Sequence, residues 1–266
     1  MNLRIKRIKE LFGYAFRLLR EDGLFTMLRR GWGFVRRRLF GKRSRYLPGP
    51  KAITAQRTAY EQEKASGVEH PVISICIPLY NTPEHFLTEL LSSVIMQTSG
   101  DWELCLADAS DEDHGYVELL VNKCRMRGGE EDQRIRYTRV ENLGISANTN
   151  AAAALATGEY LALADHDDVL APHAVYMMQK AIRESGADFL YSDEALFKKS
   201  IKRPMVGHFK PDYAPDYLLC CNYICHLAVF RRSLFEAVGG ERPEYDGSQD
   251  HDLFLRLLEQ TTPDKV

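Results

Sequence analysis

Residues 160–168 read Tyr160-Leu-Ala-Leu-Ala-Asp-His-Asp-Asp168, an apolar run that ends in three carboxylates within four residues. Acidic turns are common in loops, but one that directly follows a buried strand is a stronger sign of a site. Carboxylates this close repel one another unless a cation or strong hydrogen-bond donors offset their charge. The stretch therefore predicts a strand that ends at a site for a divalent metal, Mg²⁺ or Mn²⁺, and an ordinary acidic turn is the alternative.

Short apolar runs alternate with amphipathic segments from Val72 onward, which is typical of successive βαβ units. Their spacing leaves room for one crossover helix between consecutive strands. We therefore expect an α/β fold with a mostly parallel sheet flanked by helices, and ligands at the carboxyl ends of the strands. The predicted strands are Val72–Ile77, Trp102–Ala107, Arg134–Thr138, Tyr160–Ala164 and Phe189–Ser192, and the predicted helices are Pro83–Gln97, Gly115–Met126, Ile145–Ala156 and Pro172–Ser185.

The charge is distributed unevenly along the chain. Residues 1–45 carry 14 Lys+Arg against 3 Asp+Glu, a balance of +11, so the other residues carry −13 to reach the total of −2. A basic arm on an acidic body argues against a protein that binds nucleic acid over its whole surface. We expect no nucleic-acid partner.

The first segment, 1–45, interleaves apolar residues with Arg and Lys at near-helical spacing. This pattern predicts a basic amphipathic helical arm that lies on a membrane surface, with docking on a partner protein or on the body of this chain as the alternative. Residues 46–70 are expected to form a linker with some helix, and 71–266 the main domain. The sequence contains no apolar stretch of the ~18 to 20 residues that a membrane-spanning helix needs.

No signal peptide is recognisable at the N-terminus, so we expect a cytoplasmic protein that is peripheral at the inner face of the cell membrane. Its six cysteines are then expected to be reduced, buried thiols. Three of them, Cys220, Cys221 and Cys225, precede His226 and could suggest zinc. Because a second CxxC pair is missing, we do not expect a zinc site.

Polar residues follow two further predicted strands. Pro78-Leu-Tyr-Asn-Thr82 comes after the first strand and Asp108-Ala-Ser-Asp111 after the second. Because the carboxyl ends of parallel strands share one edge of the sheet, we expect these residues and the acidic turn to line one crevice. Alternatively, Asn81 or Thr82 caps the following helix, and the segment around Asp108 is an ordinary acidic turn.

Two other segments carry candidate groups. Gly144 opens an Ala-rich helix whose free N–H groups could face a phosphate or a sugar, with Asn142, Asn148 and Asn150 nearby, although these could equally cap and pack. Asp250 precedes an amphipathic run and could accept a proton from an incoming hydroxyl. An N-cap role is its alternative, and His251 is a second base candidate.

Five segments together resemble a known family: Ser74-Ile-Cys-Ile-Pro-Leu-Tyr-Asn81, Ala107-Asp-Ala-Ser110, Asn142-Leu-Gly-Ile-Ser146, Ala164-Asp-His-Asp-Asp168 and Ser248-Gln-Asp-His-Asp252. In this order they resemble the family 2 glycosyltransferases of the GT-A (Rossmann-like) fold, particularly bacterial rhamnosyltransferase-like members. The resemblance implies an inverting transfer from a nucleotide-diphosphate sugar to a hydroxyl of a growing cell-surface polysaccharide or lipid-linked glycan.

The resemblance also implies a role for individual residues. Asp165 and Asp167 look like the family's DxD metal pair, with Asp167 as the direct ligand and Asp108 reading the base. Asp250 falls at the position of the catalytic base. The nucleotide-binding positions implied are Pro78, Tyr80, Asn81, Asp108, Asn142, Gly144 and Asp165.

This chain departs from the family's pattern in three places. Ala107 stands where a first carboxylate is usual, and Thr149 where many relatives have Arg. Many relatives also continue past the helix of Asp250 to a metal-binding His, so ending at Val266 leads us to expect a truncated product or fragment. A non-catalytic carbohydrate-binding or nucleotide-binding relative is therefore an alternative. A nucleotidylyltransferase is disfavoured because no Gly-rich basic loop follows Val72.

Overall fold

The computed structural model describes residues 47–127, 129–198 and 206–266. The arm predicted at residues 1–45 lies outside them. Within the described residues, no helix combines the length and the apolar character that crossing a bilayer requires.

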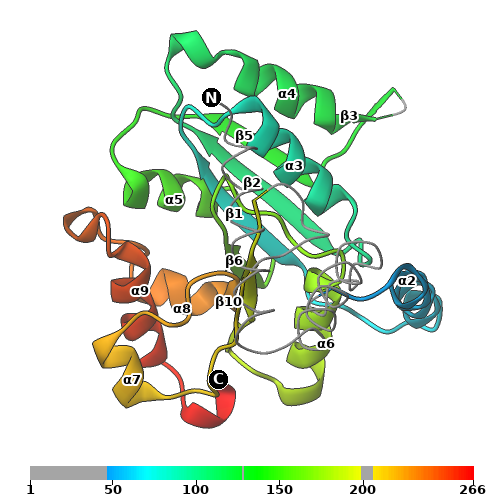
Figure 1. The fold of residues 1–266 in the computed structure, drawn as a ribbon, viewed down its shortest axis with the longest axis vertical. Helices are drawn as coiled ribbons and strands as arrows, with labels where there is room; N and C mark the ends of the chain where they lie inside the picture. Colours follow the sequence, from blue (N-terminus) through cyan, green and yellow to red (C-terminus); the bar gives the residue numbers. More distant parts are fainter. Residues whose placement is uncertain (1–46, 128, 199–205) are drawn as a thin grey trace, which may run out of the picture. The chain divides into compact units, whose positions relative to one another are not determined.

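A six-stranded sheet forms the centre of the domain, in the order β5-β2-β1-β6-β10-β7 (Figure 1). The strands β1, β2, β5 and β6 pair in parallel, whereas β10 runs antiparallel to both β6 and β7. The sheet is thus mostly parallel, as predicted. Its strands are β1 (Ile73–Leu79), β2 (Trp102–Asp108), β5 (Ile135–Arg139), β6 (Tyr160–Leu163), β7 (Phe189–Tyr191) and β10 (Ala228–Arg231).

Helices cover both faces of this sheet, because alternate side chains of each strand point to opposite faces. In β1, Ile73, Ile75 and Ile77 pack into one apolar cluster, while Cys76 packs into the other. The first cluster is completed by α3 (Glu84–Ile95), α4 (Tyr116–Arg125) and α6 (Ala174–Ser185), and the second by α5 (Ile145–Ala153), α7 (Pro215–Cys220), α8 (Arg232–Ala237) and α9 (Gln249–Leu258).

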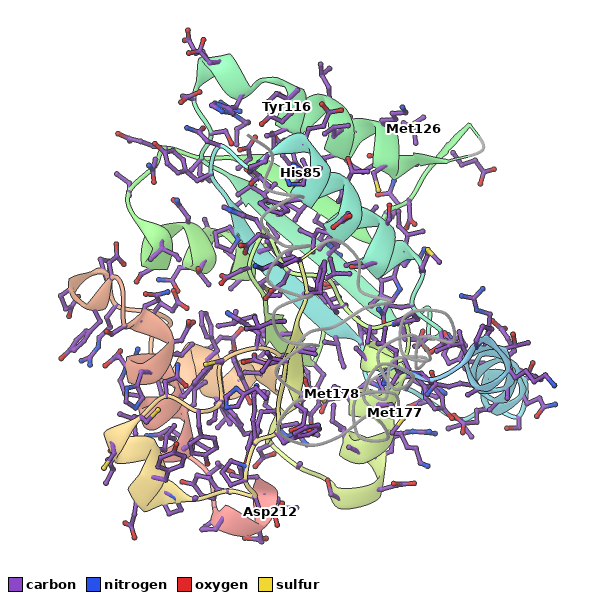
Figure 2. All side chains as sticks on the ribbon, in the orientation of Figure 1. His85, Tyr116, Met126, Met177, Met178 and Asp212 are labelled. Carbon is purple, nitrogen blue, oxygen red and sulfur yellow. The ribbon has the colours of Figure 1, made fainter. Side chains whose placement is uncertain are left out.

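Helix α6 illustrates how an amphipathic helix seats on the sheet. Met178 packs into the first cluster and is 8% exposed, whereas its neighbour Met177 is 45% exposed (Figure 2). Adjacent residues in a helix point about 100° apart, so one can pack and the other face solvent. At the start of α4, the Tyr116 hydroxyl donates to the carbonyl oxygen of Thr82 at 2.8 Å and ties α4 to the end of β1.

All five predicted strands and all four predicted helices are present, with shifted ends. The prediction missed β10, which inserts between β6 and β7. An antiparallel strand needs no crossover helix, so the regular spacing that revealed the parallel strands could not reveal this one. Two short pairs were also missed, β3 (Met126–Arg127) with β4 (Glu130–Glu131) and β8 (Glu194–Leu196) with β9 (Val206–His208).

The segment predicted as a linker contains a long helix, α2 (Pro50–Ala65). Tyr60 on this helix is buried, and its hydroxyl donates to Asp101 Oδ2 at 2.9 Å, just before β2. Pro50 opens the helix at a position where its missing N–H is not needed. Helix α2 therefore packs on the main domain.

The carboxyl end of β1 extends beyond its neighbour β6. Pairing with β6 ends at Cys76 opposite Leu163, whereas pairing with β2 continues to Leu79. Pro78 thus lies where β6 no longer offers a partner, which explains how a proline fits a central strand. The chain leaves β6 at this point and enters the acidic turn, so an opening forms beside Pro78.

Candidate active site

The acidic turn after β6 meets a histidine from a distant part of the chain. One potential metal-ligand atom from each of Asp165, Asp168 and His226 lies within 4.8 Å of the other two. His226 comes just before β10, whose Ala228 is opposite Leu163 of β6. The antiparallel pairing of these two strands therefore brings His226 to the turn, and its Nε2 lies 3.1 Å from Asp165 Oδ2.

The charges in this cluster shift one another's protonation. The hydrogen bond from His226 lowers the pKa of Asp165, against the opposite effect of burial. Burial raises the pKa of Asp168, and the charges of Asp165 and Asp167 raise it further. Burial alone lowers the pKa of His226, but its bond to Asp165 and the nearby carboxylates raise it to about 9. In the metal-free chain the imidazolium thus offsets part of the carboxylate repulsion.

The donor set of this cluster fits a divalent cation of the Mn²⁺ or Mg²⁺ type. Two carboxylates supply hard oxygen atoms and one imidazole supplies nitrogen, a combination that Mn²⁺ accepts. Asp167 was predicted as the direct ligand, but it is exposed on the turn and lies outside the three-residue cluster. Its role as a ligand stays a prediction, and the geometry favours Asp165, Asp168 and His226.

A pocket of about 300 Å³ opens beside the cluster. Its size is at the lower end for small-molecule sites. Five of the predicted site residues line it, together with Ile145, Asn148 and His166; the five are Pro78, Tyr80, Asn142, Asp165 and Asp167. The side chains that follow β1 and β6 therefore do share one crevice, as the strand order requires.

Asp108 is not on the pocket wall. It is fully buried, and its carboxylate accepts hydrogen bonds from the Tyr137 hydroxyl at 2.7 Å, Arg139 at 3.0 Å and the Ser110 N–H at 2.9 Å. Burial raises the pKa of Tyr137, and Asp108 raises it further. The structure thus shows Asp108 tying β2 to β5, and base recognition by Asp108 stays a prediction.

Asn81 joins the ends of β1 and β2 instead of lining the pocket. Its side chain donates to Asp111 Oδ2 at 2.8 Å and accepts from the Asp111 N–H at 3.0 Å. The alternative of helix capping by Asn81 or Thr82 is wrong, because Pro83 is the N-cap of α3 and no side chain caps it. Asn81 thus pairs two loops at the crevice, and its contact with a nucleotide stays a prediction.

The N-terminus of α5 faces a carboxylate of the protein itself. Gly144, with φ +101°, is the N-cap of α5, and a Cβ built on it would lie 2.3 Å from Asp246 Oδ2. Asp246 Oδ1 accepts from the Ser146 N–H at 3.2 Å and from the Ser146 hydroxyl. A phosphate or a sugar was one candidate partner for these N–H groups; in this structure Asp246 contacts them, because a carboxylate suits the positive end of a helix. Nucleotide binding at Gly144 stays a prediction.

The asparagines around α5 have structural partners. Asn142 Oδ1 accepts from the Gly144 N–H and from Asn148 Nδ2 at 3.1 Å. The side chain of Asn150 exchanges two hydrogen bonds, of 2.8 and 2.9 Å, with the backbone of Glu241. The capping and packing alternative therefore holds for Asn150, while Asn142 and Asn148 are hydrogen-bonded to each other and also line the pocket.

Asp250 stands in the first turn of α9. The N-cap of this helix is Ser248, so the alternative of an N-cap aspartate is wrong. Burial raises the pKa of Asp250, the charge of His226 opposes this shift, and Asp165 adds to it. Asp250 thus lies within electrostatic range of the cluster. His251 Nε2 lies 2.6 Å from the Leu218 carbonyl oxygen, so it fastens α9 to α7 and is not a base candidate.

Two titratable groups near the cluster were not among the predicted site residues. Glu241 is 3% exposed, and within the described part of the chain its Oε2 has no hydrogen-bond partner. His226 was considered together with three cysteines as a zinc site, which was not expected, and two of these cysteines, Cys220 and Cys221, are exposed. No local pattern marks either residue, because tertiary packing decides where each one lies.

Comparison with known proteins gives the family. Residues 74–239 match the model of Glycosyl transferase family 2. The O-antigen biosynthesis protein RfbC of Myxococcus xanthus is 34% identical over 210 residues, 78% of this chain and 16% of RfbC. The chain spans 23% and 16% of the lengths of the first curated relatives it matches.

Solved structures show the same fold. TarS 1-349 of S. aureus in complex with UDP has a TM-score of 0.53 and 20% identity, over 68% of this chain and 53% of that one. The mannosyltransferase PcManGT of Pyrobaculum calidifontis, in complex with GDP-Man and Mn²⁺, has a TM-score of 0.50 and 18% identity. The match covers 77% of this chain and 61% of that one. The fold is thus GT-A, as expected. With more than half of its residues matched by the family model, this chain belongs to glycosyl transferase family 2.

Proposed function

We propose that this chain is a metal-dependent, inverting hexosyltransferase that moves a sugar from a nucleotide-diphosphate donor to a hydroxyl of a cell-surface polysaccharide or lipid-linked glycan. One observation carries the proposal: Asp165, Asp168 and His226 converge beside a pocket, within electrostatic range of the half-buried Asp250. RfbC is an O-antigen biosynthesis protein and TarS binds UDP, which supports a glycan product and a nucleotide donor.

The pocket supplies the donor contacts in this proposal. Tyr80, 48% exposed, offers an aromatic face to the base, and Asn142 offers a polar edge to the nucleotide. Asp165, Asp168 and His226 would hold Mg²⁺ or Mn²⁺, with Asp167 beside them on the exposed rim. A cation held there would supply positive charge to offset the negative charge that develops on the departing diphosphate.

Asp250 acts as the base in this proposal. Burial favours its neutral form and so raises its pKa, which makes the carboxylate a stronger proton acceptor than an exposed aspartate. Asp250 takes the proton of the acceptor hydroxyl while that oxygen attacks the anomeric carbon. A single displacement of this kind inverts the configuration at that carbon. The N-terminal arm and a position at the inner face of the membrane belong to the same proposal, because they would bring a lipid-linked acceptor to Asp250.

Calorimetric titration of the purified chain with UDP, dTDP and GDP, each with and without Mn²⁺, tests the donor site. We expect one nucleotide to bind in a Mn²⁺-dependent manner, and Asp165→Asn to weaken that binding at least about tenfold. Asp216→Asn, an exposed change on α7, is the control. If none of the three nucleotides binds, the proposed donor site is wrong. Binding without any transfer to glycan acceptors would instead favour a non-catalytic relative.

A further inference from the structure

The imidazole of His226 lacks a usual form of support. Metal-binding histidines commonly donate their second ring nitrogen to a carboxylate or carbonyl, which fixes the ring. His226 Nδ1 is buried, and among the residues that the structure describes it has no hydrogen-bond partner. Apart from the contact of Nε2 with Asp165, the orientation of the ring therefore depends on its backbone.

That backbone is irregular, since residues 221–227 belong to no helix or strand. Buried carbonyl groups in such a segment need donors from elsewhere. Lys210 supplies them: its Nζ donates to the His226 carbonyl oxygen at 2.6 Å and also to the Ile224 carbonyl oxygen. The ammonium group thus joins two carbonyls of the segment that presents His226.

Lys210 is deeply buried, with its side chain 1% exposed. Burial lowers its pKa, and Glu194, whose Oε2 lies 3.6 Å from Nζ, opposes that shift. Two of the ammonium N–H donors are satisfied by the two carbonyls, and the Glu194 carboxylate offsets the charge as an ion pair. A buried charge is costly unless it is paired and hydrogen-bonded, so Lys210 is strongly held in this place.

The backbone of Lys210 is held as well. Its N–H donates to Asp193 Oδ1 at 2.8 Å, and Glu194 opens β8, which pairs with β9 through His208. The β8–β9 pair therefore brings Lys210 and its carboxylate partner together where Lys210 contacts the segment that carries His226. This position is independent of Asp165 and Asp168, which come from the turn after β6.

We propose that Lys210 is a positioning residue, whose ammonium group fixes the backbone of His226 so that the imidazole completes the cation site with Asp165 and Asp168. This inference rests on the proposed metal-dependent function. Without Lys210, the Ile224 and His226 carbonyls lose their donor and the ring loses its fixed direction. The two carboxylates stay in place, so metal binding should weaken without being abolished.

The test measures Mn²⁺ alone, by electron paramagnetic resonance of the free ion, in the wild type, Lys210→Met, His226→Ala and the double variant. We expect Lys210→Met to weaken Mn²⁺ binding about tenfold or more in the wild-type background. In the His226→Ala background the same change should have little effect, because its action passes through His226. Lys180→Met, an exposed change on α6, is the matched control and should bind as the wild type does.

Two outcomes would overturn the role of Lys210 but leave the proposed function standing. One is unchanged Mn²⁺ binding by Lys210→Met. The other is an equal loss of Mn²⁺ binding in the wild-type and His226→Ala backgrounds, which would indicate a general structural effect. A wild-type chain that binds no Mn²⁺ overturns the metal-dependent function and this proposal with it. Circular dichroism checks that each variant is folded. If Lys210→Met does not fold, Lys210→Gln, which keeps an N–H donor and removes the charge, is measured with the same expectations.

Discussion

His226 Nε2 lies 3.1 Å from Asp165 Oδ2, and this contact joins the turn after β6 to the segment that enters β10. It exists because β10 runs antiparallel beside β6, so the start of one strand meets the end of the other. Both residues are also ligand candidates for a cation. The contact therefore links the protonation of His226, the stability of the chain and metal binding.

The first prediction concerns stability against pH in EDTA. The pKa of His226 is about 9, above its ordinary value of 6.5. Protonated His226 therefore stabilises the fold fully below about pH 6.5, and this stabilisation is lost as pH rises through about 9. Because Asp165 is 49% exposed, solvent screens the pair, and we expect a loss of only about 1 kcal/mol. Urea denaturation at pH 6 and pH 9.5 measures it, and His226→Gln should lack this part of the pH dependence. An identical pH dependence in the variant would contradict the prediction.

The second prediction concerns Asp250. Asp250→Asn removes the proton acceptor but keeps the size of the side chain, so we expect transfer to fall by about 10²-fold or more. Binding of the nucleotide with Mn²⁺ should change less than about threefold, a difference that corresponds to less than about 0.7 kcal/mol. Initial rates of transfer and calorimetric titration measure the two effects. Asp216→Asn serves as the control, and undiminished transfer by Asp250→Asn would exclude Asp250 as the base.

The third prediction concerns the start of α5. Gly144→Ala combines a left-handed backbone, at φ +101°, with a Cβ that would lie 2.3 Å from Asp246 Oδ2. We expect a loss of about 2 kcal/mol or more in the free energy of unfolding, as strain and steric conflict add. Gly67→Ala also places Ala at a positive φ, +82°, but in open space, and should cost about 1 kcal/mol. Equal losses in the two variants would show that the Asp246 contact is not tight.

The fourth prediction concerns the buried Glu241. Burial raises its pKa to about 8 from 4.5, and the charges of Asp250, Asp246 and Asp165 add to this effect. Because the folded pKa is the higher one, stability is lost as pH rises from about 4.5 through 8. Glu241→Gln cannot ionise, so relative to the wild type it should gain ~2–4 kcal/mol between pH 5 and pH 8.5.

Chemical denaturation at the two pH values measures this gain. Glu236→Gln is the matched control, since this exposed residue on α8 pairs with Arg232 across one turn. The control should show no comparable gain. If the free energies of unfolding of Glu241→Gln and Glu236→Gln depended on pH in the same way, the prediction would be wrong. Glu241 would then be ionised in the folded chain at neutral pH.

The sequence predicted the parts of the fold that depend on local patterns. The apolar run Tyr160–Ala164 and its neighbours specify parallel strands, because side chains buried on both faces must be apolar. The same reasoning placed Pro78, Tyr80 and Asp165 at one edge of the sheet, since parallel strands end on the same side. These residues do share the pocket.

Tertiary structure decided which groups complete the site. His226 meets Asp165 only because β10 inserts between β6 and β7, and Lys210 supports it only through the β8–β9 pair. Asp246, from a loop 100 residues away in the sequence, accepts a hydrogen bond from the Ser146 N–H at the start of α5. The period of a strand or helix says which face a residue occupies but not which distant segment packs against it. The sequence alone therefore determined the parallel strands, the acidic turn and the family resemblance, whereas long-range strand order and packing determined the position of β10 and the charged cluster.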